Sequence, residues 1–252
     1  MANYSIHFSP AGGTKKTADL IASAFGGYES IDLASRNIDY SLFEFTEDDI
    51  VLISFPSFRG RAPETALERL SEMEGNGAKA ILNCTYGNRA FEDTLVEMQD
   101  TAERLGFRVV CAIASIAEHS IIGEFASDRP DRNDEHLLTF FGKMAYGKIK
   151  SGDYSTPDIP GNRPYKNVSY TVVPPMTEDC CTKCGKCIKR CPTGAISKMN
   201  PAETDASKCI LCTRCIHICP VGAKHFTTEN LEATKKKIGE VCAVYKAPEL
   251  HI

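Results

Sequence analysis

Apolar and polar positions alternate between two kinds of segment along the first 150 residues. Continuous apolar runs at residues 4–8, 49–55, 78–87 and 107–116, with a shorter run at 28–33, have the length of buried parallel strands. Between them, residues 14–25, 64–73, 90–106 and 134–150 carry apolar side chains at helical spacing. Five strands alternating with helices predict a doubly wound α/β domain over residues 1–150, with a ligand at the carboxyl ends of the strands.

Small, polar and aromatic residues gather after three of these strands, as SPAGGT (9–14), SFPSFRGR (54–61) and TYGNRAF (85–91). The first loop lies at a strand-to-helix turn, where free helix amides and glycines suit a phosphate. It matches neither the G-x-x-x-x-G-K-[ST] loop of ATP-binding proteins nor the G-x-G-x-x-G turn of dinucleotide sites. A lone phosphate monoester fits better, with hydroxyls from Ser9 and Thr14 and amides from Gly12 and Gly13.

Eight cysteines form an internal repeat, because CTKCGKCIKRCP (181–192) recurs as CILCTRCIHICP (209–220) with an offset of 28 residues. The spacing C-x2-C-x2-C-x3-C-P is that of bacterial proteins with two cubic iron–sulfur clusters, in which the fourth cysteine ligates the other cluster. A structural zinc site would leave the third cysteine of each block unexplained. The predicted ligand sets are Cys181, Cys184, Cys187 and Cys219 for the first [4Fe-4S] cluster, and Cys209, Cys212, Cys215 and Cys191 for the second.

The rest of the chain divides by composition. Residues 151–177 contain five prolines without a period, which predicts a proline-rich linker. Residues 178–227 hold the cysteine repeat, and residues 228–252 form a C-terminal helix and tail, with the helical pattern over 228–246. Four cysteines lie outside the repeat pattern, and we assign no chemical role to them: Cys84, Cys111, Cys180 and Cys242.

Charge and hydropathy narrow the function classes. The formal net charge of −4 and the lack of a long basic block argue against nucleic acid as a partner. No apolar run approaches the roughly 18 residues that cross a membrane, and the first residues do not read as a signal peptide, so we expect a cytoplasmic protein without a membrane partner. Twelve cysteines in that reducing compartment do not suit a disulfide framework. The oligomeric state has no signal in the sequence.

Two of these motifs resemble known families. The cysteine block resembles bacterial two-cluster ferredoxins over residues 178–226, and SPAGGTKKTA resembles the flavodoxin phosphate loop. Together with GNRAFEDTL (87–95) and AEHS (117–120), the chain resembles the fused flavodoxin–ferredoxin proteins of anaerobic microbes. The resemblance implies a flavodoxin-like five-stranded parallel sheet followed by a small α+β ferredoxin-like domain, with FMN and two [4Fe-4S] clusters as cofactors.

One departure concerns the phosphate loop, which usually reads Thr-Gly-Asn-Thr and here reads Ala11-Gly12-Gly13-Thr14. Backbone amides would therefore contribute more of the phosphate binding. Phe58 and Tyr86 are the candidates for stacking on the flavin ring, although core or loop packing explains either aromatic equally well. The residues implied to contact FMN are Ser9, Ala11, Gly12, Gly13, Thr14, Pro56, Ser57, Phe58, Arg59, Gly60, Thr85, Tyr86, Gly87, Asn88 and Arg89.

Candidate catalytic residues are His119, Arg59 and Arg89, which the topology brings near the rim of the implied flavin site. They could stabilise a reduced flavin or hold an acidic substrate. Each is equally consistent with a surface charge or a side chain that fixes a loop, and a lone histidine such as His119 is more often structural.

The combination of cofactors predicts the chemistry. A flavin exchanges two electrons in one step or one at a time, whereas each cubic cluster passes single electrons. We therefore expect an iron–sulfur flavoprotein that converts between one-electron and two-electron chemistry, as a reductase in anaerobic metabolism. The alternative is an electron carrier without a substrate of its own, and a redox sensor is a weaker third. The expected partner is a redox protein or a small-molecule electron donor or acceptor.

Overall fold

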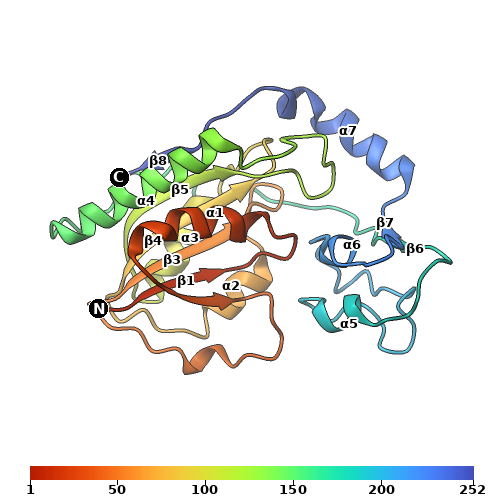
Figure 1. Cartoon of the computed structure of the whole chain (residues 1–252), viewed down its shortest axis with the longest axis horizontal. Helices are drawn as coiled ribbons and strands as arrows, with labels where there is room; N and C mark the ends of the chain where they lie inside the picture. The colour runs from red at the N-terminus through yellow and green to blue at the C-terminus, as the bar shows by residue number, and fades with distance from the viewer.

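The computed structural model describes residues 1–252, and its centre is a six-stranded sheet (Figure 1). The strand order is β2-β1-β3-β4-β5-β8, with β1 to β5 parallel and β8 antiparallel to β5. The order 2-1-3-4-5 of the parallel strands is that of the flavodoxin-like fold, which confirms the predicted fold class. The strands are β1 (Asn3–His7), β2 (Glu29–Asp32), β3 (Ile50–Pro56), β4 (Lys79–Tyr86), β5 (Arg108–Ile116) and β8 (Glu249–His251).

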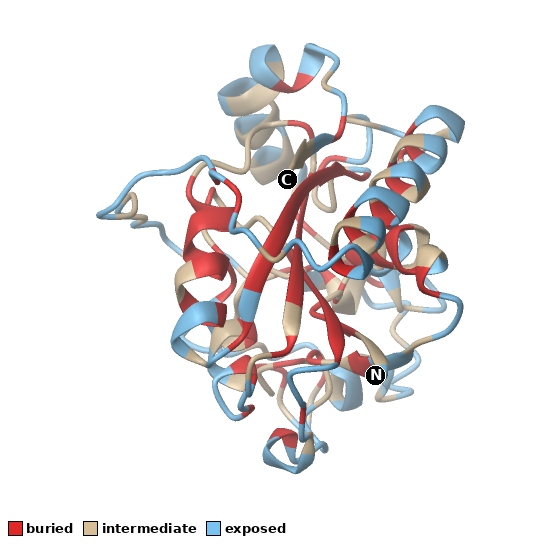
Figure 2. Ribbon diagram, turned by 90° about the vertical axis from the view of Figure 1, so that its left-hand side faces the viewer, coloured by how far each residue is buried: buried red, intermediate tan, exposed pale blue.

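Helices cover both faces of the sheet, because successive residues of each strand point to opposite sides. On one face, α1 (Gly13–Ala22) and α4 (Arg132–Lys150) pack over Ile50 and Leu52 of β3. On the other face, α2 (Glu64–Leu70) and α3 (Thr94–Arg104) pack over Val51 and Ile53 of the same strand. Figure 2 shows the central strands buried along most of their length between helices with exposed outer faces.

The cysteine repeat folds beyond the carboxyl ends of the parallel strands, on the right of Figure 1. It contains two short helices, α5 (Lys186–Arg190) and α6 (Arg214–His217), and a two-stranded antiparallel sheet of β6 (Met176–Thr177) and β7 (Lys224–His225). Two arginines attach this segment to the main domain: Arg36 Nη2 donates to the Ile188 carbonyl at 3.0 Å and Arg69 Nη2 to the Pro192 carbonyl at 2.6 Å.

The C-terminal segment returns to the main sheet. Helix α7 (Thr228–Ala243) runs back across the molecule from β7, and β8 then pairs with the outer edge of β5 (Figure 1). The expected five strands are thus six, because a three-residue strand is too short to show a period in the sequence. Its stability comes from pairing with an existing edge.

Several helix boundaries also differ from the sequence prediction: α1 and α2, for example, each end three residues early, at Ala22 and Leu70. The structure begins α3 at Thr94, four residues after the predicted start, because Glu92 has a φ of 44° that no helix accommodates. Helix α7 ends at Ala243, three residues before the predicted end. No helix of the structure is both long and apolar enough to span a membrane.

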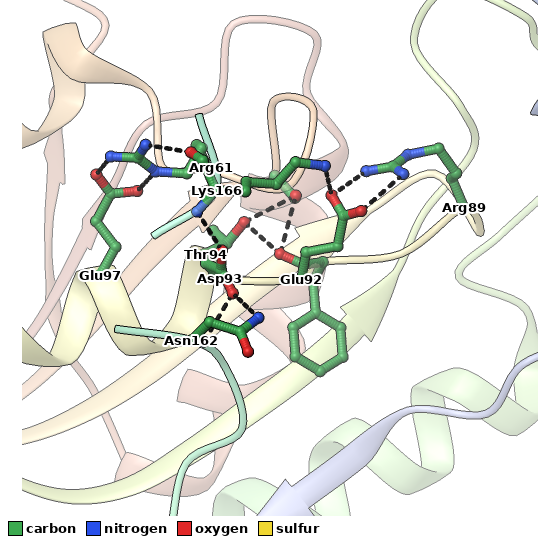
Figure 3. A network of polar contacts seen from close by, with 10 residues as sticks. Arg61, Arg89, Glu92, Asp93, Thr94, Glu97, Asn162 and Lys166 are labelled. Carbon is green, nitrogen blue, oxygen red and sulfur yellow. Dashed lines mark hydrogen bonds and ion pairs between the residues drawn. The ribbon is translucent and has the colours of Figure 1, made fainter. Parts of the chain in front are cut away.

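The proline-rich linker has no secondary structure over residues 151–175, yet polar contacts fix it to the main domain (Figure 3). The buried carboxylate of Asp93 accepts hydrogen bonds from Asn162 N at 2.8 Å, Asn162 Nδ2 at 2.9 Å and Lys166 N at 2.7 Å. Burial alone would raise the pKa of Asp93, but these amide donors lower it overall. Arg61 binds both oxygens of the Glu97 carboxylate, and its Nη1 donates to the Lys166 carbonyl at 2.8 Å.

Replacing Asp93 tests this anchor. Asp93→Ala should lower the free energy of unfolding by about 3 kcal/mol, because three donors lose a charged acceptor in a buried place. Urea unfolding measures the loss, and limited proteolysis should cut between residues 157 and 170 faster than in the parent chain. Because the Asp93 pKa is depressed in the folded state, its contribution to stability is present above the ordinary aspartate pKa and is lost as the pH falls through the folded value.

The matched control is Asp100→Asn, which weakens the contacts of Asp100 with the half-exposed Arg163 on the same linker. A solvent-screened ion pair contributes less than about 1 kcal/mol. Equal losses in the two variants would contradict the role given to Asp93.

Candidate functional site

The phosphate loop follows β1 and opens α1. Gly12 caps the helix at a φ of 98°, a left-handed conformation that glycine adopts without strain. No side chain caps this helix, and its first turn contains no acidic residue. Ser9 Oγ accepts a hydrogen bond from Lys15 N at 2.8 Å. The amides of Gly13 and Thr14 have no intrahelical acceptor and lie where a helix dipole favours an anion.

A network of buried polar side chains lies beneath this loop. Thr17 Oγ1 is 2.8 Å from Thr85 Oγ1, which is 3.0 Å from Ser115 Oγ. Asn83 completes the network, since its Nδ2 donates to Thr17 Oγ1 at 3.2 Å and its Oδ1 accepts from Ser115 Oγ at 2.8 Å. These bonds attach α1 to β4 and β5 and so fix the phosphate loop relative to the loop after β4.

A cleft with an empty volume of about 940 Å³, its open mouth included, lies at the ends of these strands. Two glycines allow its walls to approach: a Cβ on Gly13 would lie 3.0 Å from Ala117 Cβ, and one on Gly87 would lie 2.6 Å from His119 Cδ2. The structure brings eleven of the residues implied to contact FMN to this cleft, namely Ser9, Ala11, Gly12, Gly13, Thr14, Pro56, Ser57, Phe58, Thr85, Tyr86 and Gly87.

The two candidate arginines do not line the cleft. The Arg59 guanidinium carbon lies 3.6 Å from the centre of the Tyr170 ring, which is part of the linker. Arg89 forms an ion pair with Glu92 at 2.6 Å, and Lys166 of the linker binds the same carboxylate at 2.6 Å. Both arginines therefore contact or support the linker.

Gly60 and Asn88 also lie outside the cleft. A Cβ on Gly60 would lie 1.8 Å from a carboxylate oxygen of Glu92, so this glycine permits close loop packing. Asn88 Nδ2 donates to the carbonyls of Cys242 at 2.7 Å and Val244 at 2.9 Å, at the end of α7. Its side chain holds the C-terminal segment.

His119 does line the cleft. Its Nδ1 accepts hydrogen bonds from Ile121 N at 3.3 Å and Ile122 N at 3.1 Å, so the single proton of the neutral ring is on Nε2. Burial lowers the pKa of His119, and the nearby charge of Arg89 lowers it further. This histidine fixes its own loop and also presents a neutral ring at the cleft.

Arg129 lines the cleft without having been predicted. It is buried against Asp134, with Nε donating to Oδ2 at 2.7 Å, and its Nη1 donates to the Lys246 carbonyl at 2.8 Å. An isolated arginine in an irregular loop carries no sequence signal, because tertiary folding alone brings it to the site. Other lining residues outside the predicted contact set are Pro10, Lys16, Ala117, Glu118, Ser120, Cys212 and His217.

The first predicted cysteine set lines one pocket with an empty volume of about 340 Å³. Cys181, Cys184 and Cys187 line it from one block and Cys219 from the other. Burial raises the pKa of Cys219, but backbone amide donors overcome that effect and lower it overall. One of these, Ala223 N, lies 3.2 Å from Cys219 Sγ. Such amides stabilise a thiolate or a cluster ligand.

The second predicted set lies deeper. Burial raises the pKa of Cys212 and of Cys215 to about 12, and the charge of Cys191, from the other block, adds to the rise for both. Cys191 likewise raises the pKa of Cys209 after burial as the larger cause. The structure therefore places Cys191 within electrostatic reach of its three predicted co-ligands.

The second set also meets the main domain. Cys212 and His217 line the same cleft as the phosphate loop, and His217 Nε2 lies 3.2 Å from the Ser120 carbonyl. Ile210 packs against the hydrophobic core of the sheet. Of the four unassigned cysteines, Cys180 is exposed, whereas Cys84, Cys111 and Cys242 are buried.

A comparison with protein families agrees with the cysteine-containing part of this geometry. Residues 169–225 match a family model described as a 4Fe-4S dicluster domain. The chain thus combines a flavodoxin-like fold with a 4Fe-4S dicluster domain. The chain has no significant match among curated proteins.

Solved structures similar to the chain cover 54–60% of it. They include an archaeal flavodoxin, with 14% identity, 99% of that chain covered and a TM-score of 0.40. Flavodoxin 1 of Bacillus cereus has 16% identity, 98% of that chain covered and a TM-score of 0.41. Rubredoxin oxygen:oxidoreductase of the anaerobe Desulfovibrio gigas is also similar (12%, TM-score 0.44), and the chain spans 36% of its length.

A methyl group at Gly87 tests the shape of the cleft. Gly87→Ala should displace the loop at 117–120, because the new Cβ would lie 2.8 Å from the His119 backbone as well as 2.6 Å from its ring. We expect at least a tenfold weaker affinity for FMN, about 1.4 kcal/mol, with a lower melting temperature.

Isothermal titration of flavin-free chain with FMN measures the affinity. The control is Gly147→Ala in α4, where an added Cβ meets nothing within 4 Å. That change should leave FMN affinity unaltered, and an equal effect of the two substitutions would contradict the proposed position of the flavin.

Proposed function

We propose that the chain is an iron–sulfur flavoprotein that moves electrons between two [4Fe-4S] clusters in the dicluster domain and an FMN in the cleft. The observation that carries this proposal is that Cys212 and His217 of the dicluster domain line the same cleft as the phosphate loop. A flavin in that cleft would thus share a wall with the second cysteine set.

The cleft fits an FMN in three respects. The amides of Gly13 and Thr14 and the hydroxyls of Ser9 and Thr14 would bind the phosphate at the start of α1. The cleft is lined by the loops after β1, β3, β4 and β5, at the strand ends where this fold binds a ligand. Phe58 and Tyr86 line the cleft and supply aromatic surface.

The two cysteine sets differ in exposure, which supports an order of transfer. Cys184 of the first set is exposed, whereas the thiols of the second set are half-buried and one lines the cleft. We infer that external electrons pass at the first cluster and that the second cluster exchanges them with FMN. When bound, the clusters carry single electrons and FMN accepts or gives two.

A redox protein is the partner that the outer surface favours. Four exposed cations, Lys183, Lys186, Lys189 and Arg190, surround the first set, and none of them forms an ion pair within the chain. A rim of this kind favours a partner with an acidic docking face.

Between a reductase and a carrier, the residues of the cleft support the reductase. The neutral ring of His119 can donate a hydrogen bond from its Nε2–H, and the guanidinium of Arg129, which is paired with Asp134, also lines the cleft, so the cleft offers polar groups that could orient an anionic substrate. A carrier needs no such groups. The reaction would be the reduction of a small molecule that reaches the flavin through the open side of the cleft.

Cofactor content and one cysteine substitution test the proposal. Anaerobically purified chain should hold about one FMN and about eight irons, as two cubic clusters require. Cys212→Ser should lower the iron content toward about four per chain and slow the bleaching of the flavin by an external one-electron donor, measured by stopped-flow absorbance at matched flavin content.

The control is Cys180→Ser, an exposed thiol next to a predicted ligand but outside the repeat. It should keep full iron and normal flavin reduction. Eight irons without flavin, even after FMN is added, would overturn the assignment of the cleft. Iron loss in Cys180→Ser equal to that in Cys212→Ser would overturn the assignment of the ligands.

A further inference from the structure

A buried lysine lies between the two cysteine sets. Lys224 begins β7, its side chain is 3% exposed, and it lines the pocket of the first set with Cys187 and Cys219. Its ammonium Nζ is buried and has no hydrogen-bond partner. A cation taken out of water without a partner is costly, so a buried lysine requires an anion close by.

The acidic side chains of the dicluster domain are engaged elsewhere or exposed. Glu178 binds His225 at 2.6 Å, and Asp205 binds Lys208 at 3.2 Å. Glu203 accepts from Asn200. None of them pairs with Lys224, so the compensating negative charge must come from the cysteine sets and what they hold.

The field of Lys224 reaches both sets. Lys224 shares its pocket with Cys187 of the first set, and its charge also acts on the sulfur atoms of Cys209 and Cys215 in the second set. A cubic cluster with four thiolates is an anion, and it gains one more negative charge on reduction. A fixed cation in this place would therefore favour the reduced form of either cluster.

The internal repeat shows that packing does not require this lysine. The offset of 28 residues pairs Lys224, in PVGAK, with Ile196, in PTGAI. Ile196 is also buried, at 4% exposure. One half of the repeat thus fills the position with an apolar side chain and the other with an ammonium, and the difference between them is charge.

We propose that Lys224 is a buried counter-cation shared by the two clusters, which raises the reduction potential of both. It acts through the clusters and contacts no substrate. The proposal rests on the cluster assignment of the proposed function and adds a residue that sets the driving force for electron exchange.

The test is a redox titration of Lys224→Met and Lys224→Ile holoprotein, with the cluster signals followed by electron paramagnetic resonance. The ratio of reduced to oxidised cluster at a fixed potential should fall at least tenfold, equal to a shift of about 59 mV for a one-electron couple. Lys198→Met removes the same charge from an exposed position of the same domain and should leave both potentials unchanged.

The outcomes separate the two proposals. Wild-type chain with fewer than about eight irons would count against the proposed function itself. Full iron with unchanged potentials in both Lys224 variants would overturn the role of Lys224 alone. If neither Lys224→Met nor Lys224→Ile held iron, Lys224→Arg should still hold it, because arginine keeps the charge. Loss of iron in Lys224→Arg as well would indicate a packing role and overturn the proposal.

Discussion

The dicluster domain is tied at both ends to the flavodoxin-like domain, and the rest of the structure depends on that constraint. At its entrance, the buried carboxylate of Asp93 receives three amide donors from a linker that has no secondary structure. At its exit, α7 leads to β8, which pairs with β5, while Asn88 and Arg129 hold the carbonyls before it. A domain anchored at one end could swing, whereas anchoring at both ends restricts it. Electron exchange falls steeply with distance, so this restriction is what a transfer path needs.

The same anchors explain why conspicuous loop residues lie outside the cleft. Arg59 and Arg89 come from loops at the carboxyl ends of strands, where binding residues are expected, yet their charges contact the linker and its supports. In a two-domain chain, one strand-end surface must hold the ligand and also the neighbouring domain. Here the first residues of the loops after β3 and β4 line the cleft, and the residues that follow in the same loops hold the linker and the C-terminal segment.

The buried strands and the cysteine repeat were predictable from the sequence, each for its own physical reason. Buried strands such as β3 leave continuous apolar runs, and the cysteine repeat restricts ligand spacing so tightly that it predicts an exchange of Cys191 and Cys219 between the blocks. Strand β8 was not predictable, because three residues show no period and its partner lies more than 130 residues earlier. Arg129 and Cys212 reach the cleft through tertiary folding alone, which no local pattern encodes. The sequence shows that Lys224 differs in type from Ile196, the residue at the equivalent position of the repeat. Only the structure shows that its ammonium is buried without a hydrogen-bond partner, which is the observation that suggests a role.

The basic side chains of the dicluster domain fall into an exposed group and a buried group. Residues 178–227 contain eight lysines and arginines and four aspartates and glutamates, although the whole chain has more acidic than basic residues. Most of that excess is exposed around the first cysteine set, whereas Arg214 and Lys224 are turned inward. Exposed cations act on a partner through solvent and are screened by salt, while a buried cation acts on the clusters at short range and is screened far less. On the two proposals made above, partner recognition and cluster potential belong to different side chains, so that either could change without altering the other.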